Sequence, residues 1–475
     1  MELRIAILLS LLASAGVLAR ADDGGRPNII LVMADDQGWG DMAYNGHPHL
    51  KTPNFDRAAA EGLRFDRFYA AAPVCSPTRA SVLTGRTPNR SAVFKWGHPI
   101  RPQEVTVAEV LAGAGYRTAH FGKWHLGSVR NGSPANPGAN GFQFWSSAPN
   151  FYENNPIFSS KGMATRMKGE SSMVTVDGAL DFVKGALAEK APFFVVIWFG
   201  SPHLPHIALA GDRAPYRHLP ERDQNFLGEI TGMDRAYGKL RDKLEEWKIR
   251  ENTILWYCSD NGALPGVGSS GGHRGHKGKV YEGGLLVPSI LEWPARLGKP
   301  RSTGMRCITS DIYPTLLEIA GARVEQQPLI DGVSLVPLID GVTESREKAF
   351  GFWDYPVGGI STPSAKWMQE LLEEQQKGGD LKPHPSSQRA AELPNPKFPL
   401  DSFPGHSAWV SGDWKLHRIQ GRGEREASWE LYDLARDRAE ARDLFARQTV
   451  VAARLREELE DWLQSVSRSM NGEDY

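Results

Sequence analysis

Residues 27–41 read PNIILVMADDQGWGD, an apolar run that ends in two adjacent carboxylates. The apolar segment Ile29–Ala34 does not alternate with polar residues, which predicts a strand in a sheet covered on both faces. In open sheets of this kind, ligands bind beyond the carboxyl ends of the strands. Asp35 and Asp36 follow the strand directly, so this stretch predicts both the type of sheet and the position of its site.

Three further strands are predicted to end in polar residues in the same way. They are the predicted strand at 116–121 and the apolar runs at 193–199 and 253–258, which lead to Lys123 with His125, to His203, and to Asp260 with Asn261. Helical patterns at 54–61, 174–187 and 223–247 lie between the strands. This alternation predicts an α/β fold with a large mixed, mostly parallel sheet sandwiched by helices. The polar side chains are expected on one rim of that sheet.

The pattern changes after residue 343. Short strands are predicted at 349–353, 407–410, 414–419 and 429–432, followed by an amphipathic helix at 450–466. We therefore expect a small C-terminal antiparallel sheet with one helix, residues 344–475, beside an α/β domain at residues 22–343. Residues 356–404 are rich in Pro, Ser, Lys and Glu with little periodicity, which predicts an inserted loop.

Residues 1–21 have the pattern of a signal peptide. Arg4 precedes the apolar run Ile5–Leu18, and Ala19 and Ala21 occupy the two positions that signal peptidase reads. The run is short for a transmembrane helix, so the retained membrane anchor is the less favoured alternative. We expect a secreted or periplasmic protein that has no membrane attachment after cleavage.

Charge and cysteine content exclude several classes of protein. The 475 residues include 55 basic and 56 acidic side chains, a balance that provides no field for nucleic acid or acidic membranes. Only Cys75, Cys258 and Cys307 are present, too few for a disulfide-rich scaffold. Cys258 and Cys307 can pair if Cys75 is modified, although buried thiols are the favoured state.

A short helix is predicted to begin at Cys75, because residues 75–86 read CSPTRASVLTGR. Pro77 suits the first turn of a helix, and Gly85 suits its end. Cys75 then lies where free backbone N–H groups favour an anion, with Arg79 one turn along on the same face. The alternative interpretation is an ordinary buried cysteine at a helix N-terminus.

The predicted rim carries a set of oxygen ligands: Asp35, Asp36, Asp260 and Asn261. A carboxylate-rich set without nitrogen or sulfur is typical of a hard cation, and it suits Ca²⁺ better than Mg²⁺. Each pair alone can equally form a helix cap or a turn. Their occurrence on one rim favours a metal site.

These motifs together resemble the type I sulfatases, which belong to the alkaline-phosphatase superfamily. The resemblance extends from Pro27 to about Leu444 and rests on motifs at 35–41, 75–86, 122–127, 201–203, 259–262, 281–284, 412–416 and 430–434. It implies that a formylglycine-generating or anaerobic maturation enzyme oxidises Cys75 to formylglycine. It also implies that Asp35, Asp36, Asp260, Asn261 and an oxygen of residue 75 bind Ca²⁺, with Mg²⁺ as the alternative.

The resemblance implies a role for each remaining polar residue. The hydrated aldehyde would attack sulfur while Arg79, Lys123 and Lys277 neutralise the sulfuryl oxygens. His203 is expected to protonate the leaving oxygen, with Lys277 as a possible partner in that step. His125 is expected to take a proton from the second hydroxyl so that sulfate leaves. Lys279 lies close to Lys277 in sequence and competes for its role.

The sequence departs from the family at a few positions. Leu286 stands where the family has a basic residue, which is expected to alter support around the site rather than its chemistry. No polar residue after Gly141-Phe142 matches the family unambiguously. His206 and His406 are expected near the mouth of the pocket, either as substrate contacts or as structural residues.

The sequence thus predicts an exported, calcium-dependent hydrolase of sulfate monoesters. The expected substrates are sulfated carbohydrates, with aryl sulfates as surrogates. One rival is a phosphate or phosphonate monoester hydrolase of the same superfamily, because phosphoryl and sulfuryl groups share size and geometry. The other is a non-catalytic carbohydrate-binding protein, in which Cys75 stays unmodified. The pattern assigns neither the sulfate position nor an oligomeric state.

Overall fold

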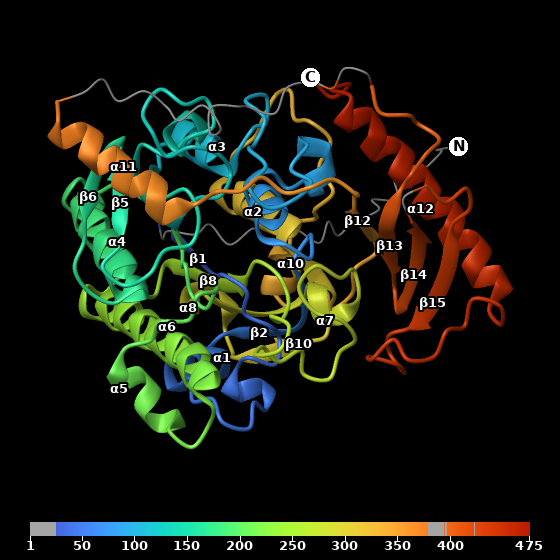
Figure 1. Ribbon diagram of the computed structural model, residues 1–475, viewed down its shortest axis with the longest axis horizontal. Helices are drawn as coiled ribbons and strands as arrows, with labels where there is room; N and C mark the ends of the chain where they lie inside the picture. Colours follow the sequence, from blue (N-terminus) through green and yellow to red (C-terminus); the bar gives the residue numbers. More distant parts are fainter. Residues whose placement is uncertain (1–24, 379–393, 395–396, 422) are drawn as a thin grey trace, which may run out of the picture.

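The computed structural model describes residues 25–378, 394, 397–421 and 423–475. These residues form a large α/β unit and a smaller unit built on an antiparallel sheet (Figure 1). The predicted signal peptide, residues 1–21, lies outside the described residues. Within them, every helix is too short or too polar to cross a membrane.

The large sheet has 11 strands, with β1 (Asn28–Ala34) near its centre. Strands β8, β1, β7, β3 and β4 are parallel neighbours, whereas β9 runs antiparallel to both β2 and β8. This mixed, mostly parallel sheet confirms the predicted fold class. In spatial order the strands are β10 (Arg301–Thr303), β2 (Leu63–Tyr69), β9 (Leu286–Glu292), β8 (Thr253–Ser259), β1, β7 (Phe193–Trp198), β3 (Arg117–Lys123), β4 (Phe144–Ala148), β5 (Ile157–Ser160) and β6 (Met163–Arg166), with β11 (Cys307–Ile308) also paired with β2.

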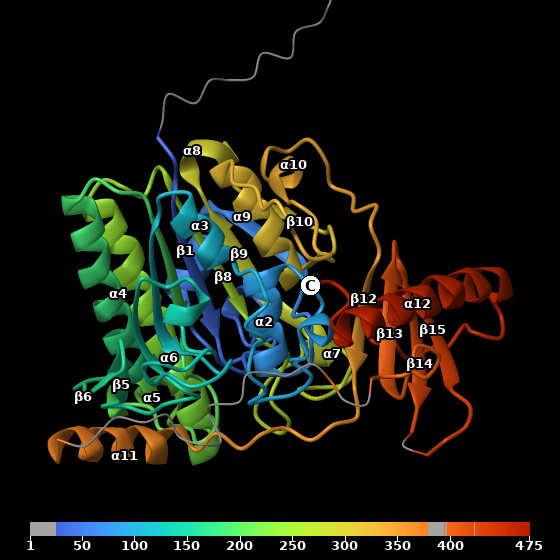
Figure 2. The same ribbon diagram turned by 90° about the horizontal axis from the view of Figure 1, so that it is seen from above.

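Both faces of the sheet are covered, which explains why β1 is apolar throughout. Ile30 and Val32 pack into the core beneath α1, α4 and α6, whereas Leu31 and Met33 face the core beneath α2, α3 and α9. Figure 2 shows the sheet between these two layers of helices. The layers are made by α1 (Pro53–Glu61), α4 (Ser171–Ala188) and α6 (Glu221–Glu246) on one face, and by α2 (Cys75–Thr84), α3 (Val107–Gly113) and α9 (Ile312–Ala320) on the other.

The smaller unit is a four-stranded antiparallel sheet covered by one long helix (Figure 1). Leu455, Leu459 and Leu463 of the helix recur at helical spacing and are fully buried against the sheet. The elements are β12 (Phe350–Asp354), β13 (Gly405–Ser411), β14 (Trp414–Gln420), β15 (Ser428–Asp433) and α12 (Thr449–Met470).

A buried polar network joins the two units. Lys415 on β14 is fully buried, and its Nζ lies 2.9 Å from Glu282 of the large unit and 3.1 Å from Glu440. Tyr69 at the end of β2 donates to the same Glu282 side chain at 2.9 Å. The strands of the small sheet are thereby fixed to the segment that carries Lys277.

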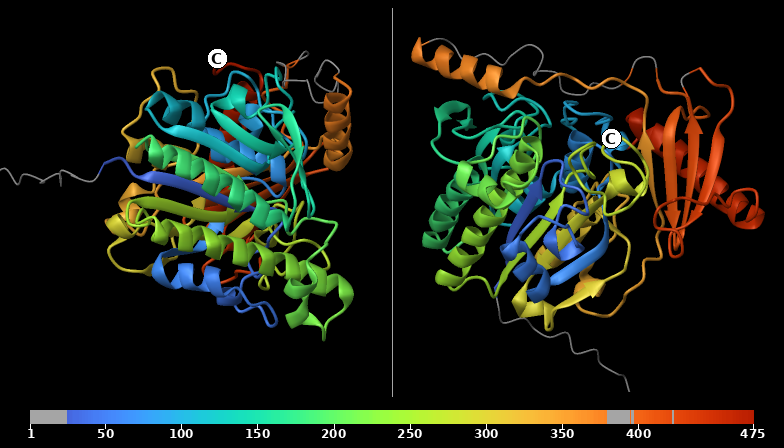
Figure 3. Two further views of the ribbon diagram at one scale, coloured as in Figure 1. Left: turned by 90° about the vertical axis from the view of Figure 1, so that its left-hand side faces the viewer. Right: turned by 60° about the horizontal axis from the view of Figure 1, so that its bottom comes forward.

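The segment between β12 and β13 differs from the prediction. Residues 356–404 were expected to lack pattern, but α11 (Ser364–Gln376) forms inside them and packs on β5 and β6. Its buried Met368 and Leu371 are spaced as on one helix face. Figure 3 shows the chain leaving β12 and crossing the large unit to reach α11.

Short helices complete the described elements. They are η1 (Ala43–Asn45), η2 (Pro88–Ser91), η3 (Gly138–Asn140), α5 (Ala210–Arg213), η4 (Ala214–Tyr216), α7 (Glu282–Leu285), α8 (Pro294–Leu297), η5 (Thr309–Asp311) and α10 (Val336–Ile339).

Candidate active site

Cys75 is the first residue of α2, as the sequence predicted. Val74 before it is extended, and Gly85 closes the helix in a left-handed conformation with φ 70°. The thiol is 2 % exposed, and its Sγ lies 3.3 Å from Nδ1 of His125. Burial raises the pKa of the thiol despite the opposing charges of Lys123 and Lys277. An unmodified Cys75 would therefore be protonated and weakly reactive.

Three carboxylates meet at the carboxyl ends of β1 and β8. Asp35, Asp36 and Asp260 are all fully buried, and the Asp36 backbone N–H donates to Asp260 Oδ1 at 3.0 Å. Asp36 has a φ of 73°, a conformation that costs a non-glycine residue energy and is found mainly at functional sites. The parallel pairing of β1 with β8 brings these residues together from distant parts of the sequence.

Each carboxylate has its own cation. Lys123 Nζ lies 2.7 Å from Asp35 and Lys277 Nζ lies 2.6 Å from Asp36. Arg79 Nη2 lies 2.6 Å from Asp260. Of the two competing lysines, Lys277 therefore reaches the carboxylates, whereas Lys279 is exposed. Lys277 remains 20 % exposed, but Arg79 and Lys123 are completely buried behind the carboxylates.

The electrostatics separate the two adjacent aspartates. Burial, aided by the charges of Asp260 and Asp36 and opposed by Lys123, raises the pKa of Asp35 to about 8. Burial also acts to raise the pKa of Asp36, but Lys277 and His203 beside it hold that pKa below its usual value. Burial of several carboxylates in one place, each with a different set of neighbouring cations, thus moves the pKa values of Asp35 and Asp36 apart.

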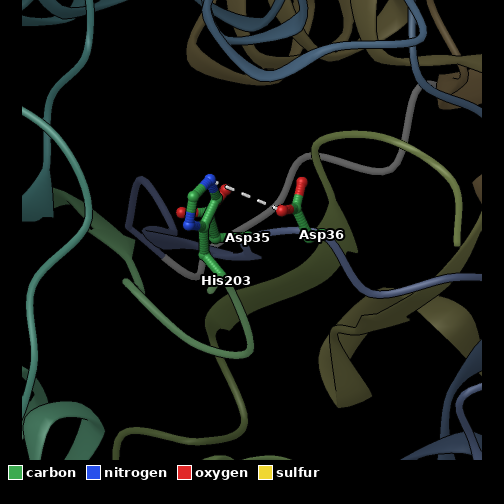
Figure 4. A group of neighbouring side chains, drawn as sticks. All are labelled: Asp35, Asp36 and His203. Carbon is green, nitrogen blue, oxygen red and sulfur yellow. Dashed lines mark ion pairs between the residues drawn. The ribbon is translucent and has the colours of Figure 1, made fainter. Parts of the chain in front are cut away.

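Two oxygens of this group have no hydrogen-bond partner among the described residues. They are Oδ1 of Asp35 and Oδ1 of Asn261, both buried. Unpartnered buried acceptors are rare in proteins, and hard-cation sites are a known exception. Oxygens of Asp35 and Asp36 and a ring nitrogen of His203 also lie within 4.8 Å of one another (Figure 4). The residues present therefore fit a divalent metal ion.

His125 faces Cys75 with a neutral ring. Burial, together with the charges of Lys123 and Arg79, holds the pKa of His125 well below its usual value. Its Nε2 is buried without a partner among the described residues, and its backbone φ is 54°. A neutral imidazole so close to residue 75 is suited to accept a proton from it.

His203 approaches the carboxylates from the loop after β7. Its Nε2 lies 3.6 Å from Asp36 Oδ2 (Figure 4). Its Nδ1 donates to the Leu204 carbonyl at 2.6 Å. Burial and the charges of Lys123 and Lys277 lower the pKa of His203 to about 4, although Asp36 acts in the opposite direction. Phe151 stacks on the ring, a contact that the sequence patterns did not suggest because an isolated aromatic residue carries no motif.

The remaining sequence candidates lie in buried surroundings. The His206 side chain is 3 % exposed and lies beside Glu229. The Nε2 atom of His406 lies 2.8 Å from Nδ1 of His417, within hydrogen-bond distance. Leu286 is buried as the first residue of β9. Cys258 and Cys307 are buried free cysteines, in agreement with the favoured expectation.

Comparisons with known proteins establish the family. A family model described as Sulfatase matches residues 27–322. The chain is 34 % identical to the N-acetylgalactosamine-6-sulfatase of Canis lupus familiaris over 372 residues, 70 % of each protein. It is 31 % identical to the arylsulfatase A of Homo sapiens over 446 residues, which are 84 % of this chain and 85 % of that protein.

A solved structure has the same fold. It is the complex of Ps i-CgsB with k-i-k-neocarrahexaose, which superposes with a TM-score of 0.77 at 21 % identity, covering 94 % of this chain and 98 % of that one. The protein belongs to the sulfatase family, within the alkaline-phosphatase-like superfamily. Members of this family hydrolyse sulfate esters, so the chain is a sulfuric ester hydrolase.

Proposed function

We propose that this sulfatase hydrolyses sulfate monoesters of carbohydrates, using a formylglycine derived from Cys75 and a bound Ca²⁺ ion. The observation that carries the proposal is the position of Cys75 at the start of buried helix α2, next to a neutral His125 and a group of carboxylates and cations. A thiol in this position is inert, and it is a poor ligand for a hard cation. Conversion to an oxygen-bearing side chain removes both difficulties.

The residues proposed to hold the metal are Asp35, Asp36, Asp260 and Asn261, with residue 75. The unpartnered oxygens of Asp35 and Asn261 support this assignment. When bound, the ion supplies a Lewis acid that polarises the sulfate ester and orients it. Several carboxylates and an amide oxygen favour Ca²⁺, because Mg²⁺ usually keeps more of its water ligands.

The cations are proposed to act in two ways. Arg79 and Lys123 are fully buried and paired with Asp260 and Asp35 respectively. They therefore hold those carboxylates in place and contribute positive charge to the site without being exposed to solvent. Lys277 is partly exposed, and it is the cation best placed to contact the sulfuryl oxygens of a substrate. Positive charge held in place before the reaction stabilises the charge that develops on sulfate oxygens.

The two histidines are proposed to move protons at opposite sides of the reacting group. One hydroxyl of the aldehyde hydrate attacks sulfur and loses its proton to a carboxylate of the site, while the bond from sulfur to the alcohol oxygen breaks. The proton of the second hydroxyl must then leave, so that the C–O bond to sulfate breaks and the aldehyde is restored. His125, neutral and facing residue 75, accepts that proton. His203 donates a proton to the leaving alcohol oxygen, and the negative charge of the bound sulfate ester raises its pKa for this purpose.

The substrate is proposed to be a sulfated sugar in an extracellular or periplasmic setting. Two relatives support this class, since one is named for N-acetylgalactosamine 6-sulfate and a structural neighbour holds a carrahexaose. The signal-peptide pattern at residues 1–21 supports export. Maturation of Cys75 requires a formylglycine-generating or anaerobic enzyme as partner.

The first experiment compares two buried cysteines. The chain is produced with a maturation enzyme, and the peptide that spans residue 75 is examined by mass spectrometry. We expect an aldehyde at residue 75. Cys75→Ala should abolish hydrolysis of 4-nitrophenyl sulfate, whereas the matched change Cys258→Ala should retain it. Equal rates for Cys75→Ala and the parent would overturn the proposal.

The second experiment separates sulfatase from phosphatase. Turnover of 4-nitrophenyl sulfate and 4-nitrophenyl phosphate is measured on the same matured protein, followed by a panel of sulfated sugars. We expect a higher kcat/KM for the sulfate ester. Faster hydrolysis of the phosphate ester would support the phosphate or phosphonate monoester alternative instead.

A further inference from the structure

A basic cavity lies between the large unit and the antiparallel sheet, apart from the candidate active site. We call it the seam cavity; its volume is about 420 Å³ and its lining includes Trp39, Arg64, Arg67, His273, Arg306 and Arg438. Its basic side chains come from β2, from the segments before β11 and α7, and from the turn after β15. Residues 75, 79, 123, 125 and 203 do not line it.

The arginines that line the seam cavity outnumber the carboxylates beside them. Arg306 and Arg67 share one carboxylate, Asp413, at 2.7 Å and 3.8 Å. Arg438 forms no ion pair with any described residue. Arg64 is paired with Asp66 at 2.9 Å. The lining therefore has a surplus of positive charge in a chain whose overall charge is close to neutral.

Two carboxylates in the lining do not correct this surplus. Asp66 is engaged with Arg64. Glu282 accepts from Tyr69 at 2.9 Å and from Lys415 at 2.9 Å in the buried network between the units. Glu282 therefore acts on Arg306 through its charge, which helps to raise the pKa of Arg306, but forms no ion pair with it.

Arg306 provides the strongest indication of a missing anion. Its side chain is 8 % exposed, and Nε and Nη2 have no hydrogen-bond partner among the described residues. Desolvation, followed by the charges of Arg306 and Arg438, lowers the pKa of Arg67. Buried guanidinium nitrogens are normally paired, and their planar donors match the oxygens of sulfate, phosphate or carboxylate groups.

The basic lining continues beyond the seam cavity. A second hollow of about 300 Å³ shares Arg67 and Arg306 with it and adds Arg346 and Lys348. Arg346 is paired with the buried Asp311 at 2.6 Å, whereas Lys348 Nζ donates to the Ile330 carbonyl at 3.2 Å and forms no ion pair with any described residue. Together the two hollows are lined by six cationic side chains of Arg and Lys and by four carboxylates, namely Asp66, Glu282, Glu344 and Asp413.

We propose that the seam cavity binds a sulfate group on a sulfated glycan, at a sugar unit other than the one being hydrolysed. This inference rests on the proposed carbohydrate substrate. Two adjacent hollows that share Arg67 and Arg306 suit a ligand in which sulfate groups repeat along a sugar chain. Trp39 adds an aromatic side chain to the lining, which suits the apolar face of a sugar ring. The alternative source of the same chemistry is free inorganic sulfate, the product of the reaction.

The test measures binding without turnover. In a Cys75→Ala background, the Kd values of a chondroitin 6-sulfate hexasaccharide and of sodium sulfate are measured by calorimetry. The variant is Arg67→Gln with Arg438→Gln. The matched control is Arg436→Gln, which changes an exposed arginine on the same turn that does not line the cavity. Thermal melting checks that each variant is folded.

We expect the double variant to weaken hexasaccharide binding at least tenfold, while the control keeps the Kd of the parent. An unchanged hexasaccharide Kd in the double variant overturns the proposal. Weaker binding of sodium sulfate with an unchanged hexasaccharide Kd also overturns it and assigns the site to free sulfate. If the double variant does not fold, Arg438→Gln alone is measured, because this side chain is exposed. Hydrolysis of 4-nitrophenyl sulfate by the matured parent tests the proposed function separately.

Discussion

Phe151 stacks on His203 with ring centroids 4.3 Å apart and planes 14° from parallel. One face of the imidazole is therefore covered, while Nδ1 is held by the Leu204 carbonyl and Nε2 points towards Asp36. The stacking on Phe151 and the hydrogen bond to Leu204 restrict the rotation and the tilt of the His203 ring, which we propose as the proton donor. Its orientation thus depends on a residue outside the sulfatase motifs.

Replacing Phe151 tests this dependence. Phe151→Ala should lower kcat/KM for 4-nitrophenyl sulfate by about tenfold, because a loosely held ring spends less time aligned with the leaving oxygen. Phe151→Tyr keeps the stacked ring and should retain most of the activity. Thermal melting should show both variants folded. Equal kcat/KM for Phe151→Ala and the parent would show that the stack does not position His203.

Removal of the metal should destabilise the folded protein as well as inactivate it. Chelation leaves Asp35, Asp36 and Asp260 buried without the added cation, so Tm should fall and hydrolysis should stop. Returning Ca²⁺ should restore both Tm and activity at lower concentration than Mg²⁺. An unchanged Tm and unchanged activity after complete chelation, verified by elemental analysis, would contradict the metal assignment.

The buried lysine between the two units should be critical for stability. Lys415→Met removes the cation from Glu282 and Glu440, which leaves buried carboxylates unpaired and should cost about 3–5 kcal/mol. The matched change Lys239→Met breaks a surface pair with Asp177 and should cost about 0–1 kcal/mol. Denaturant unfolding measures both. Similar losses for the two variants would disprove the special role of Lys415.

Gly359 should be needed for the position of the segment that leads to α11. A Cβ at Gly359 would lie 2.2 Å from the Trp96 ring, whereas a Cβ at Gly358 would meet nothing within 4 Å. The neighbouring Gly97 N–H donates to Ser76 Oγ at 2.8 Å, directly beside residue 75.

Gly359→Ala should therefore lower kcat/KM several-fold, because a shift of Trp96 is passed to the start of α2. Gly358→Ala is the matched control and should behave as the parent. The measurement is hydrolysis of 4-nitrophenyl sulfate and of a sulfated oligosaccharide. Identical kinetics for the two alanine variants would show that the packing against Trp96 has no influence on the site.

Glu153 should make stability depend on pH. Burial, aided by the charge of Glu229, raises the pKa of Glu153 to about 8. The folded protein then keeps a proton that the unfolded chain has already released, so the free energy of unfolding falls as pH rises from the ordinary glutamate range to about 8. Glu153→Gln has no such proton to lose.

The advantage of Glu153→Gln over the parent should therefore grow by about 1–2 kcal/mol between pH 5 and pH 8, a figure reduced because the side chain is partly exposed. Denaturant unfolding at the two pH values measures the difference. A constant difference between the two proteins would show that Glu153 titrates in its ordinary range.

The sequence predicted the centre of the fold well, because its strands are apolar throughout and end in polar residues. The runs at Ile29–Ala34 and at 253–258 are β1 and β8, whose parallel register brings Asp35 and Asp260 together. The predicted start of α2 at Cys75 was also confirmed. An uninterrupted apolar run is typical of a strand that is covered on both faces, which is what β1 and β8 are.

The outer parts were less predictable, because their structure depends on what they pack against. The segment Ser364–Gln376 is a helix whose Met368 and Leu371 pack in the core with β5 and β6, and the polar residues around them hid that short apolar face in the sequence. The antiparallel direction of β9 also could not be read from its apolar run. The pairing of each cation with a particular carboxylate required the three-dimensional arrangement.

The burial of Cys75 has a consequence for the order of events during biosynthesis. Every residue of α2 is buried, so an enzyme that must bind the peptide around residue 75 has no access to that peptide in the folded protein. If Cys75 is oxidised as we propose, this oxidation would therefore be confined to the interval between synthesis and folding. Molecules that fold before Cys75 is oxidised would be permanently inactive. The active fraction of a preparation would therefore depend on the relative rates of oxidation and folding.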